Sequence, residues 1–377
     1  MKLHRILAVM RKEFIHIIRD PLSLAMAIAL PMILLILFGF ALTLDVDDVP
    51  LIVWDQSETA QSREFVGGFT GSRYFSLREY ALNYSQVGNA IDSGRALIGL
   101  VIPRDFDRQL KSGTPARVQL IIDGTNANTA TLAMGYAQTV IGTFSQSIMI
   151  DKTYRASGAR IEPPLNLEPR VWFNEELESR NFIFPGLIAV IMMIIAALLT
   201  SLTVAREREN GTMEQLISTP VKGPELVIGK LTPYVVIGMI DVAIAVLMGE
   251  FLFHVPLRGS VVMLFGLSFI FLVGVLSLGV LFSVLSKTQV MASQMTMLAT
   301  FVPSFLLSGF IFPISNMPKI IQLITYIVPA RYYITMLKGI YLKGVGPSVL
   351  YVEAIFMIIF GVVMLMLAIV KFKKKLE

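Results

Sequence analysis

Residues 182–204 read FIFPGLIAVIMMIIAALLTSLTV, an apolar run without a charged side chain. The hydrocarbon core of a bilayer is about 30 Å thick, and an α-helix of about 20 apolar residues crosses it. This stretch therefore predicts a membrane-spanning helix. Similar runs cover residues 22–44, 226–253, 261–285, 291–312 and 350–370. We expect a polytopic α-helical membrane protein with about six spans.

The composition agrees with a protein embedded in lipid. Of its 377 residues, 55% are hydrophobic and 16% are charged, far from the usage of soluble domains. The chain has no cysteine, which excludes disulfides and thiolate metal sites. His4, His16 and His254 are far apart in the sequence, so we expect no metal site. We attribute the net charge of +5 to orientation in the membrane rather than to binding of nucleic acid.

Two predicted elements lie before residue 45, where the sequence becomes polar. Residues 1–20 place apolar side chains on one helical face and basic ones opposite, which predicts an amphipathic helix on the inner leaflet rather than a cytosolic tail. Residues 21–44 form the first predicted span, which Pro31 should kink. This run is too long for the apolar core of a cleaved signal peptide, so we interpret it as a retained anchor.

Residues 45–180 have the composition of a soluble domain inserted after the first span. Strand-like runs at 51–54, 74–80, 96–102 and 117–122 alternate with helical stretches that follow Ser57, Ser85 and Asp105 and cover 129–154. This alternation predicts an α/β domain. Basic residues are concentrated in both tails, so both termini should be cytoplasmic and the domain extracytoplasmic.

Residues 181–377 contain the other five predicted spans and two unusual connections. One is an outer segment, 313–349, which carries Lys319, Arg331, Lys338 and Lys343 against the positive-inside trend. Within it, residues 320–328 are apolar but too few to cross a bilayer, which predicts a re-entrant segment. We expect the tyrosines at 326, 332, 333, 341 and 351 to form an interfacial belt.

The other connection is an inner loop, 205–222, which includes RERENGTMEQLISTP at 206–220. Gly211 can form a turn, and Thr212 and Gln215 have the spacing of a capping box. The pattern predicts a short helix that begins at Thr212 and ends before Pro220. The alternative from these residues alone is an ordinary charged cytoplasmic loop.

This run resembles the first coupling loop of the permeases of type-2 ABC exporters. RKEFIHIIRDP at 11–21 and PSFLLSGFIFPISNMP at 303–318 also resemble that family, as do the number and order of the spans. The resemblance implies that the loop couples the spans to a cytosolic ATPase. It assigns this role to Arg206, Glu207, Arg208, Glu209, Asn210, Gly211, Thr212, Glu214, Gln215 and Pro220.

The resemblance also implies partners and a location. The chain would be a permease subunit, not an enzyme, in the inner membrane of a bacterium, and it would export drugs, lipids or other amphipathic substrates. It would pair with a second permease copy, as a homodimer or a paralogous heterodimer, and dock a cytosolic ABC ATPase that binds the ATP. The large outer domain resembles that of the multidrug-type subgroup, which works with a periplasmic adaptor.

The sequence itself contains no phosphate-binding loop. Gly229 and Lys230 are followed by Leu231 within an apolar run, without the preceding glycine-rich turn and the following Ser or Thr that bind nucleotide phosphates and Mg²⁺. We therefore expect no cofactor on this chain and hydrolysis by a partner.

Four polar residues within predicted spans are candidates for a translocation path. Asp241 lies near the middle of the third span, where a carboxylate is costly unless it faces protein or water. It could line a path or pack as a protonated group. Gln294, Ser304 and Ser308 give the fifth span a polar face, although the spacing of the two serines also favours close helix packing.

Two other functions remain open at this stage. A secondary transporter could use Asp241 and Glu250 as ion or proton carriers, although we find no internal repeat of the kind many such carriers show. A membrane receptor or scaffold could bind a ligand with its outer domain. The residues do not specify a substrate.

Overall fold

The computed structural model describes residues 2–42, 47–157, 172–174 and 178–372. It divides into two compact units, one made of Met1–Leu44 with Arg170–Glu377 and the other of Asp45–Pro169. We refer to these as unit 1 and unit 2. The first boundary falls where the sequence predicts the end of the first span, and the second falls at residue 169 rather than 180.

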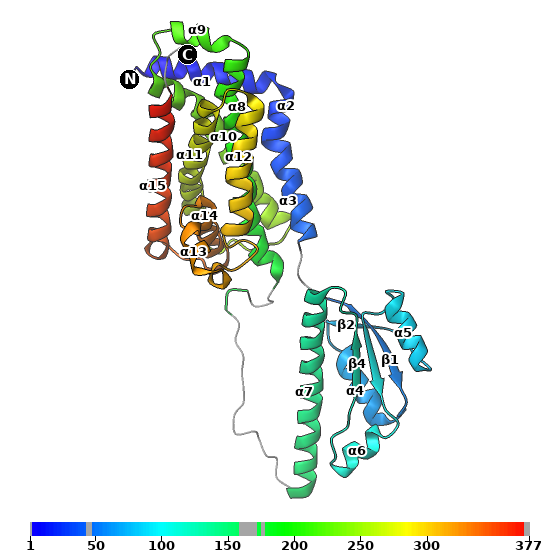
Figure 1. Cartoon of the computed structure of the whole chain (residues 1–377). Coiled ribbons are helices and arrows are strands. Elements are labelled where there is room, and N and C mark those ends of the chain that lie inside the picture. Colours follow the sequence, from blue (N-terminus) through cyan, green and yellow to red (C-terminus); the bar gives the residue numbers. More distant parts are fainter. Residues whose placement is uncertain (1, 43–46, 158–171, 175–177, 373–377) are drawn as a thin grey trace. The chain divides into compact units, whose positions relative to one another are not determined.

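Unit 1 is a bundle of long helices with short helices at both ends (Figure 1). Its first part comprises α1 (Leu3–Arg19), α2 (Pro21–Leu24), a π-helical turn (Ala25–Ala29) and α3 (Leu30–Ala41). The later part comprises α8 (Ser179–Glu209), α9 (Thr212–Ser218), α10 (Gly223–Phe251), α11 (Val261–Leu285), α12 (Gln289–Val302, extended by a π-helical turn, Pro303–Leu307), α13 (Lys319–Thr325), α14 (Pro329–Lys338, extended by a π-helical turn, Gly339–Lys343) and α15 (Pro347–Lys371). A 3-10 turn, Ile314–Asn316, precedes α13.

Five of these helices are long and apolar enough to cross a membrane: α8, α10, α11, α12 with its π extension, and α15. A sixth arises if α13 and α14 with its π extension, which are bent by 83° across the break at residues 326–328, count as one span. The first apolar helix, Ala25–Ala41, is shorter. Counted from Pro21 the helical stretch is unbroken and about 30 Å long at about 1.5 Å per residue. The expectation of a mostly helical protein with about six spans is therefore confirmed for five of them, while the first expected span, residues 21–44, corresponds to the shorter apolar helix.

The π-helical turn in the first apolar helix has a local cause. Pro31 has no N–H to donate to the carbonyl one turn earlier, and its ring crowds that carbonyl, so a regular α-helix is disrupted just before it. The helix widens at Ala25–Ala29 and then continues. The irregularity thus lies on the N-terminal side of the proline that the sequence marks.

Helix α8 is the centre of the bundle. Of its 18 most apolar consecutive residues, 78% are buried, against 22% of the corresponding residues of α12 and 17% of those of α15. It packs closely on α11 at Gly279, where a Cβ atom would lie only 2.1 Å from Oγ1 of Thr200. That Oγ1 donates a hydrogen bond to the carbonyl of Leu276, 2.9 Å away. A small residue at 279 therefore lets the two backbones approach.

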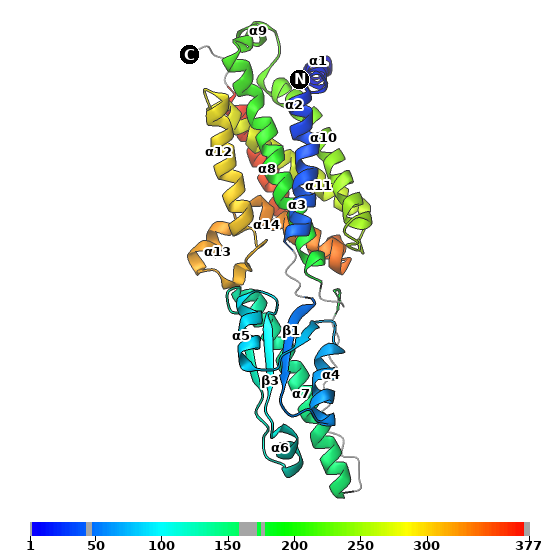
Figure 2. The ribbon, with the colours of Figure 1, turned by 90° about the vertical axis from the view of Figure 1, so that its right-hand side faces the viewer.

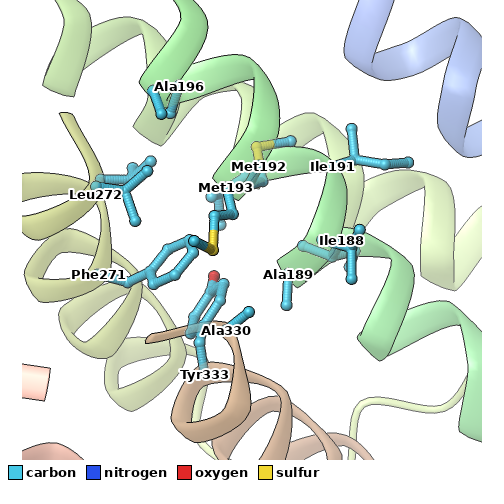
Figure 3. Close-up of a cluster of buried hydrophobic side chains, with 14 of the residues drawn as sticks. Ile188, Ala189, Ile191, Met192, Met193, Ala196, Phe271, Leu272, Ala330 and Tyr333 are labelled. Carbon is cyan, nitrogen blue, oxygen red and sulfur yellow. The ribbon is translucent and has the colours of Figure 1, made fainter. Parts of the chain in front are cut away.

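Side chains from three helices meet beside α8 (Figure 3). The ring of Tyr333 on α14 stacks on Phe271 of α11 with centroids 3.9 Å apart, and its hydroxyl lies 2.7 Å from that of Ser268. Met193 of α8 points toward this group, whereas Met192 points away from it (Figure 3).

The predicted belt of tyrosines is wrong in part. Tyr332, Tyr333 and Tyr341 are buried within the protein, whereas Tyr326 and Tyr351 are exposed. The physical reason is that the bend before Pro329 turns α14 into the bundle, where its tyrosines pack against neighbouring helices. Tyr332, for example, stacks on Phe356 of α15 with ring centroids 5.2 Å apart.

Unit 2 contains a four-stranded mixed sheet with the order β2-β1-β3-β4. Its elements are β1 (Val49–Asp55), α4 (Ala60–Thr70), β2 (Phe75–Tyr80), α5 (Tyr84–Asp92), β3 (Ile98–Ile102), α6 (Phe106–Ser112), β4 (Gln119–Ile122) and α7 (Ala127–Ser157). Strand β1 runs parallel to β2 and β3, and β4 runs antiparallel to β3. The predicted α/β fold is confirmed.

The helices of unit 2 cover both faces of the sheet (Figures 1 and 2). Phe65 and Phe69 of α4 pack with Ala133 of α7 on the face that Leu51 and Val53 line, and Val87 of α5 packs on Ile52 of the other face. The turn before α7 is held by Asp123, whose carboxylate accepts from the hydroxyl and the backbone N–H of Thr125. These two hydrogen bonds, the first being the stronger influence, lower the pKa of Asp123.

Candidate functional site

The inner loop between α8 and α10 contains the predicted short helix. Helix α9 begins at Thr212 and ends at Ser218, before Pro220, so this prediction is confirmed. Gly211 has a φ of +68°, a left-handed conformation that glycine adopts without strain, and it turns the chain after α8. The loop therefore folds back along the end of α8.

The capping role predicted for Thr212 is wrong in detail. Thr212 is the first residue of α9 rather than the cap that precedes it. Its hydroxyl donates to the backbone carbonyl of Glu207, 3.2 Å away. The last carbonyls of a helix lack partners within that helix, and the turn at Gly211 brings Thr212 to one of them. Thr212 thus connects α9 to the last turn of α8.

Four charged residues form a cluster beneath this loop, which we call the buried ion cluster: Lys12, Glu13, Glu207 and Lys230. Nζ of Lys230 donates to Oε1 of Glu13 at 2.7 Å and forms an ion pair with Oε2 of Glu207 at 2.9 Å. Lys12 reaches Oε1 of Glu207 at 2.6 Å. Lys230 is 2% exposed, Glu13 4% and Glu207 8%, whereas the side chain of Lys12 is 52% exposed and closes the cluster from outside. The two positive and two negative charges balance, and they join α1, α8 and α10.

The other charged residues at the end of α8 each reach a different element. Arg206 pairs with Asp20 at 3.1 Å, at the corner between α1 and α2. Arg208 donates to the carbonyl of Ser286 at 2.5 Å, and Glu209 accepts from the backbone N–H of Gln289 at 3.0 Å. The start of the loop is therefore tied to the helices on both of its sides.

A second anchor holds the end of the loop. The carboxylate of Glu225 accepts from the backbone N–H groups of Lys2 at 2.7 Å and Lys222 at 2.9 Å. Arg5 donates to the carbonyl of Pro220 and lies 3.7 Å from Glu225. Helix α1 thus contacts the loop near both of its ends.

Helix α9 itself faces outward. Among the residues of α9 whose side chains the structure describes, Met213 is buried, whereas Glu214 and Gln215 are exposed. Asn210 and Gly211 are exposed as well. A cavity of about 460 Å³ lies beneath the helix, lined in part by His16, Arg206, Asn210, Thr212, Gln215 and Tyr234. The structure therefore brings the predicted coupling residues together, anchored on one side and accessible on the other.

The candidate path residues are not brought together in the same way. Asp241 is buried on α10, and its Oδ1 has no hydrogen-bond partner among the described residues. Ser304 and Ser308 are buried in or just after the π extension of α12, and the hydroxyl of Ser304 lies 2.9 Å from Sδ of Met193 on α8. Gln294 is exposed on another face of α12. The two serines thus take part in helix packing in this chain.

Sequence reasoning missed three residues of the buried ion cluster: Lys12, Glu13 and Lys230. Glu13 and Lys230 are separated by 217 positions, so no spacing rule connects them. A signal did exist, because a lysine within a long apolar run needs a partner or water. Lys230 occupies such a position.

The long apolar helices define the class of this protein as a polytopic helical membrane protein. The chain belongs to the ABC-2 family of transporter proteins, whose family model matches residues 21–370. Permeases of this kind act with a partner ATPase, which uses the ATP.

Relatives of known description match almost the whole chain. The chain is 36% identical over 374 residues to the probable multidrug ABC transporter permease YbhS of Escherichia coli (strain K12), covering 99% of this chain and 98% of the relative. It is 31% identical over 353 residues to the probable multidrug ABC transporter permease YbhR of the same strain, covering 92% of each chain. It is 25% identical over 329 residues to the inner membrane transport permease YhhJ, covering 86% and 85%.

Proposed function

We propose that this chain is the permease subunit of a multidrug-type ABC exporter in the bacterial inner membrane. In this proposal the exposed face of α9, with Glu214 and Gln215, docks the cytosolic ATPase. The observation that carries the proposal is the anchoring of this loop. Its backbone and charged side chains are tied to α1, α8, α10 and the start of α12, so a displacement of α9 would move these helices together.

The proposed orientation places α1, α9 and both termini in the cytoplasm. Helices α1 and α9 and the end of α15 lie at one end of unit 1, whereas α3 ends and α8 begins at the opposite end, where the sequence of unit 2 is inserted (Figure 1). The N-terminal tail carries Lys2, Arg5, Arg11, Lys12 and Arg19, which favours the cytoplasmic side. Unit 2 would then be extracytoplasmic.

We further propose that two permease copies pair, either identical or paralogous, and that the path lies between them. Gln294 supports this arrangement, because its exposed amide would be costly against lipid but not against a second copy or water. Amphipathic drugs are the proposed substrates, since YbhS and YbhR are described as probable multidrug permeases. A periplasmic adaptor acting on unit 2 belongs to the same proposal and rests on family resemblance.

Docking is tested with the permease purified together with its ATPase. Glu214→Arg should lower the amount of ATPase recovered, because it reverses a charge on the exposed face of α9. The control is Glu58→Arg, which reverses the charge of an exposed residue of unit 2 and should leave the recovery unchanged. Equal recovery with both variants would place the docking surface elsewhere.

The orientation has its own test, which the absence of cysteine makes direct. In intact spheroplasts an impermeant thiol reagent should label Ser112→Cys but neither Ser218→Cys nor Lys2→Cys. All three positions are exposed. Labelling of Ser218→Cys from outside would reverse the proposed topology.

A further inference from the structure

Unit 2 contains a groove that its fold does not require. It lies between α4 and α7, next to the turn that precedes β2, and has a volume of about 600 Å³. Pockets that hold drug-sized ligands have volumes of about 300–1,000 Å³. Its lining residues are Glu64, Gly68, Ser72, Tyr74, Tyr136, Thr139, Val140, Thr143, Phe144 and Ser147.

The wall of the groove is a mixed aromatic and hydroxyl surface. Helix α7 presents Tyr136, Thr139, Val140 and Thr143 at the spacing of one helical face. The ring of Tyr74 stacks on Tyr136 with centroids 4.0 Å apart and planes within 16°. A flat, rigid aromatic pair at one end of a groove is suited to contact the face of a planar ligand.

The floor of the groove is kept open by a glycine. Gly68 lies within α4, where a glycine costs about 1 kcal/mol relative to alanine. A Cβ atom at this position would come within 3.2 Å of Cγ1 of Val140 and would begin to fill the space. Its neighbour Gly67 does not line the groove, and a Cβ there would meet nothing within 4 Å.

The polar groups of the groove mostly offer acceptors. The hydroxyls of Thr139 and Thr143 donate to carbonyls of their own helix at 3.0 Å each, and that of Ser147 does so at 2.8 Å. The hydroxyl of Ser72 donates to the carbonyl of Phe69 at 2.8 Å. With the hydrogen of each hydroxyl engaged, its free lone pairs face outward as acceptors. The exposed carboxylate of Glu64 adds a negative charge to this set.

We propose that this groove binds drug-sized aromatic molecules that carry an amine or ammonium group. The aromatic pair would contact the ring system, the hydroxyl lone pairs would accept hydrogen bonds from N–H groups of the amine or ammonium, and Glu64 would attract the positive charge. This proposal goes beyond the proposed function, because binding to unit 2 requires neither ATP nor export.

The test measures binding of ethidium, a planar aromatic cation, to the full-length permease in lipid nanodiscs without ATPase. Fluorescence anisotropy should show saturable binding that empty nanodiscs do not show. Fluorescein, a planar aromatic anion, should bind at least about tenfold more weakly, a difference of about 1.4 kcal/mol. Binding of ethidium to empty nanodiscs alone, or equal binding of fluorescein, would overturn the proposal.

Matched variants then locate the site. Gly68→Leu should weaken ethidium binding by about tenfold or more, because it fills the floor, whereas Gly67→Leu should bind as the wild type does. Thr143→Val should weaken binding by removing an acceptor, while Thr131→Val serves as its control. Thr131 is also exposed on α7 and also donates to its own helix, at 2.7 Å, but it does not line the groove.

A separate variant tests the contribution of the negative charge of Glu64. Glu64→Gln should weaken ethidium binding by about threefold, as expected for an exposed ion pair, and added salt should reduce the difference from wild type. Thermal melts of all variants guard against misfolding. If Gly68→Leu unfolds, the outcome rests on Thr143→Val and Glu64→Gln. Wild-type affinity for ethidium in both of these variants would show that the groove is not the binding site. This conclusion would not depend on whether the proposed export function is correct.

Discussion

Helix α10 carries three buried charged residues, Glu225 in its first turn and, further along, Lys230 and Asp241, and the last two have opposite environments. Lys230, near its cytoplasmic end in the proposed orientation, is surrounded by two carboxylates at 2.7 and 2.9 Å. Asp241, about 16 Å further along the helix axis, is 3% exposed and has one carboxylate oxygen without a hydrogen-bond partner among the described residues. Oε2 of Glu207 also lacks a hydrogen bond, so the difference is one of charge: Lys230 is paired with two carboxylates, whereas Asp241 forms no ion pair among the described residues.

The difference separates two uses of buried charge in a membrane protein. A complete cluster holds helices in fixed positions, and its members depend on one another because each charge compensates the next. An incomplete site contributes little to stability, and its persistence points to a role with water, a proton or a passing molecule. We therefore propose a structural and coupling role for the buried ion cluster and a transport role for Asp241, with packing as the alternative.

The largest effect is expected for Lys230→Met. This change leaves Glu13 and Glu207 buried next to each other without their shared cation. Removing one partner of a buried ion pair costs about 3–5 kcal/mol, so the detergent-solubilised permease should melt at a clearly lower temperature. Lys287→Met, which removes an exposed lysine, is the control and should melt as the wild type does.

A triple variant sharpens this result. Glu13→Leu, Glu207→Leu and Lys230→Met together replace the three buried members of the cluster by apolar side chains and leave only the exposed Lys12. Such a replacement often restores the stability lost on breaking a buried pair. If the cluster also transmits movement, the triple variant should melt near the wild-type temperature but show weaker coupling between ATP hydrolysis and transport. Normal coupling would limit the cluster to a structural role, and a wild-type melt of Lys230→Met alone would show that the cluster is not needed for stability.

The next effect is smaller and concerns Thr212. Its hydroxyl hydrogen bond to Glu207 contributes about 1 kcal/mol, too little to unfold the bundle but enough to loosen α9 from α8. Thr212→Ala should therefore leave the melting temperature of the permease almost unchanged and reduce the stimulation of ATP hydrolysis by substrate. Thr212→Ser keeps the hydroxyl and should restore that stimulation. Equal stimulation in the Ala and Ser variants would mean that this hydrogen bond plays no part in coupling.

Local sequence patterns predicted most of the fold. The apolar runs identified the long helices, and the alternation of short segments identified the α/β order of unit 2, because both signals depend on neighbours within one element. The short helix at Thr212–Ser218 was predicted for the same reason, since Gly211 and Pro220 mark its limits locally.

Features that depend on tertiary contacts were not predicted. The partners of Lys230 come from helices α1 and α8, which are distant in sequence, and the inward turn of α14 follows from its packing on α11 and α15. The sequence pattern of α1 also gave an incomplete account of its buried face. Its buried residues are Val9, Glu13 and Ile17, and the carboxylate of Glu13 can be buried only because Lys230 of α10 pairs with it.

The smallest effect on stability is expected for Asp241→Asn, which tests the other half of the contrast on α10. The amide has nearly the volume of the carboxyl group but no charge, and no ion pair is broken in the part of the chain that the structure describes. The melting temperature should therefore not fall. If Asp241 takes part in transport, however, the same variant should change the rate of export by the reconstituted complex, because it can neither bind a cation nor exchange a proton. Asp241→Leu is the matched second change, since it fills similar space without any polar group and separates loss of charge from loss of hydrogen bonding. A lower melting temperature of Asp241→Asn with normal export would instead identify Asp241 as a packing residue, and its contrast with Lys230 would then be one of degree rather than of kind.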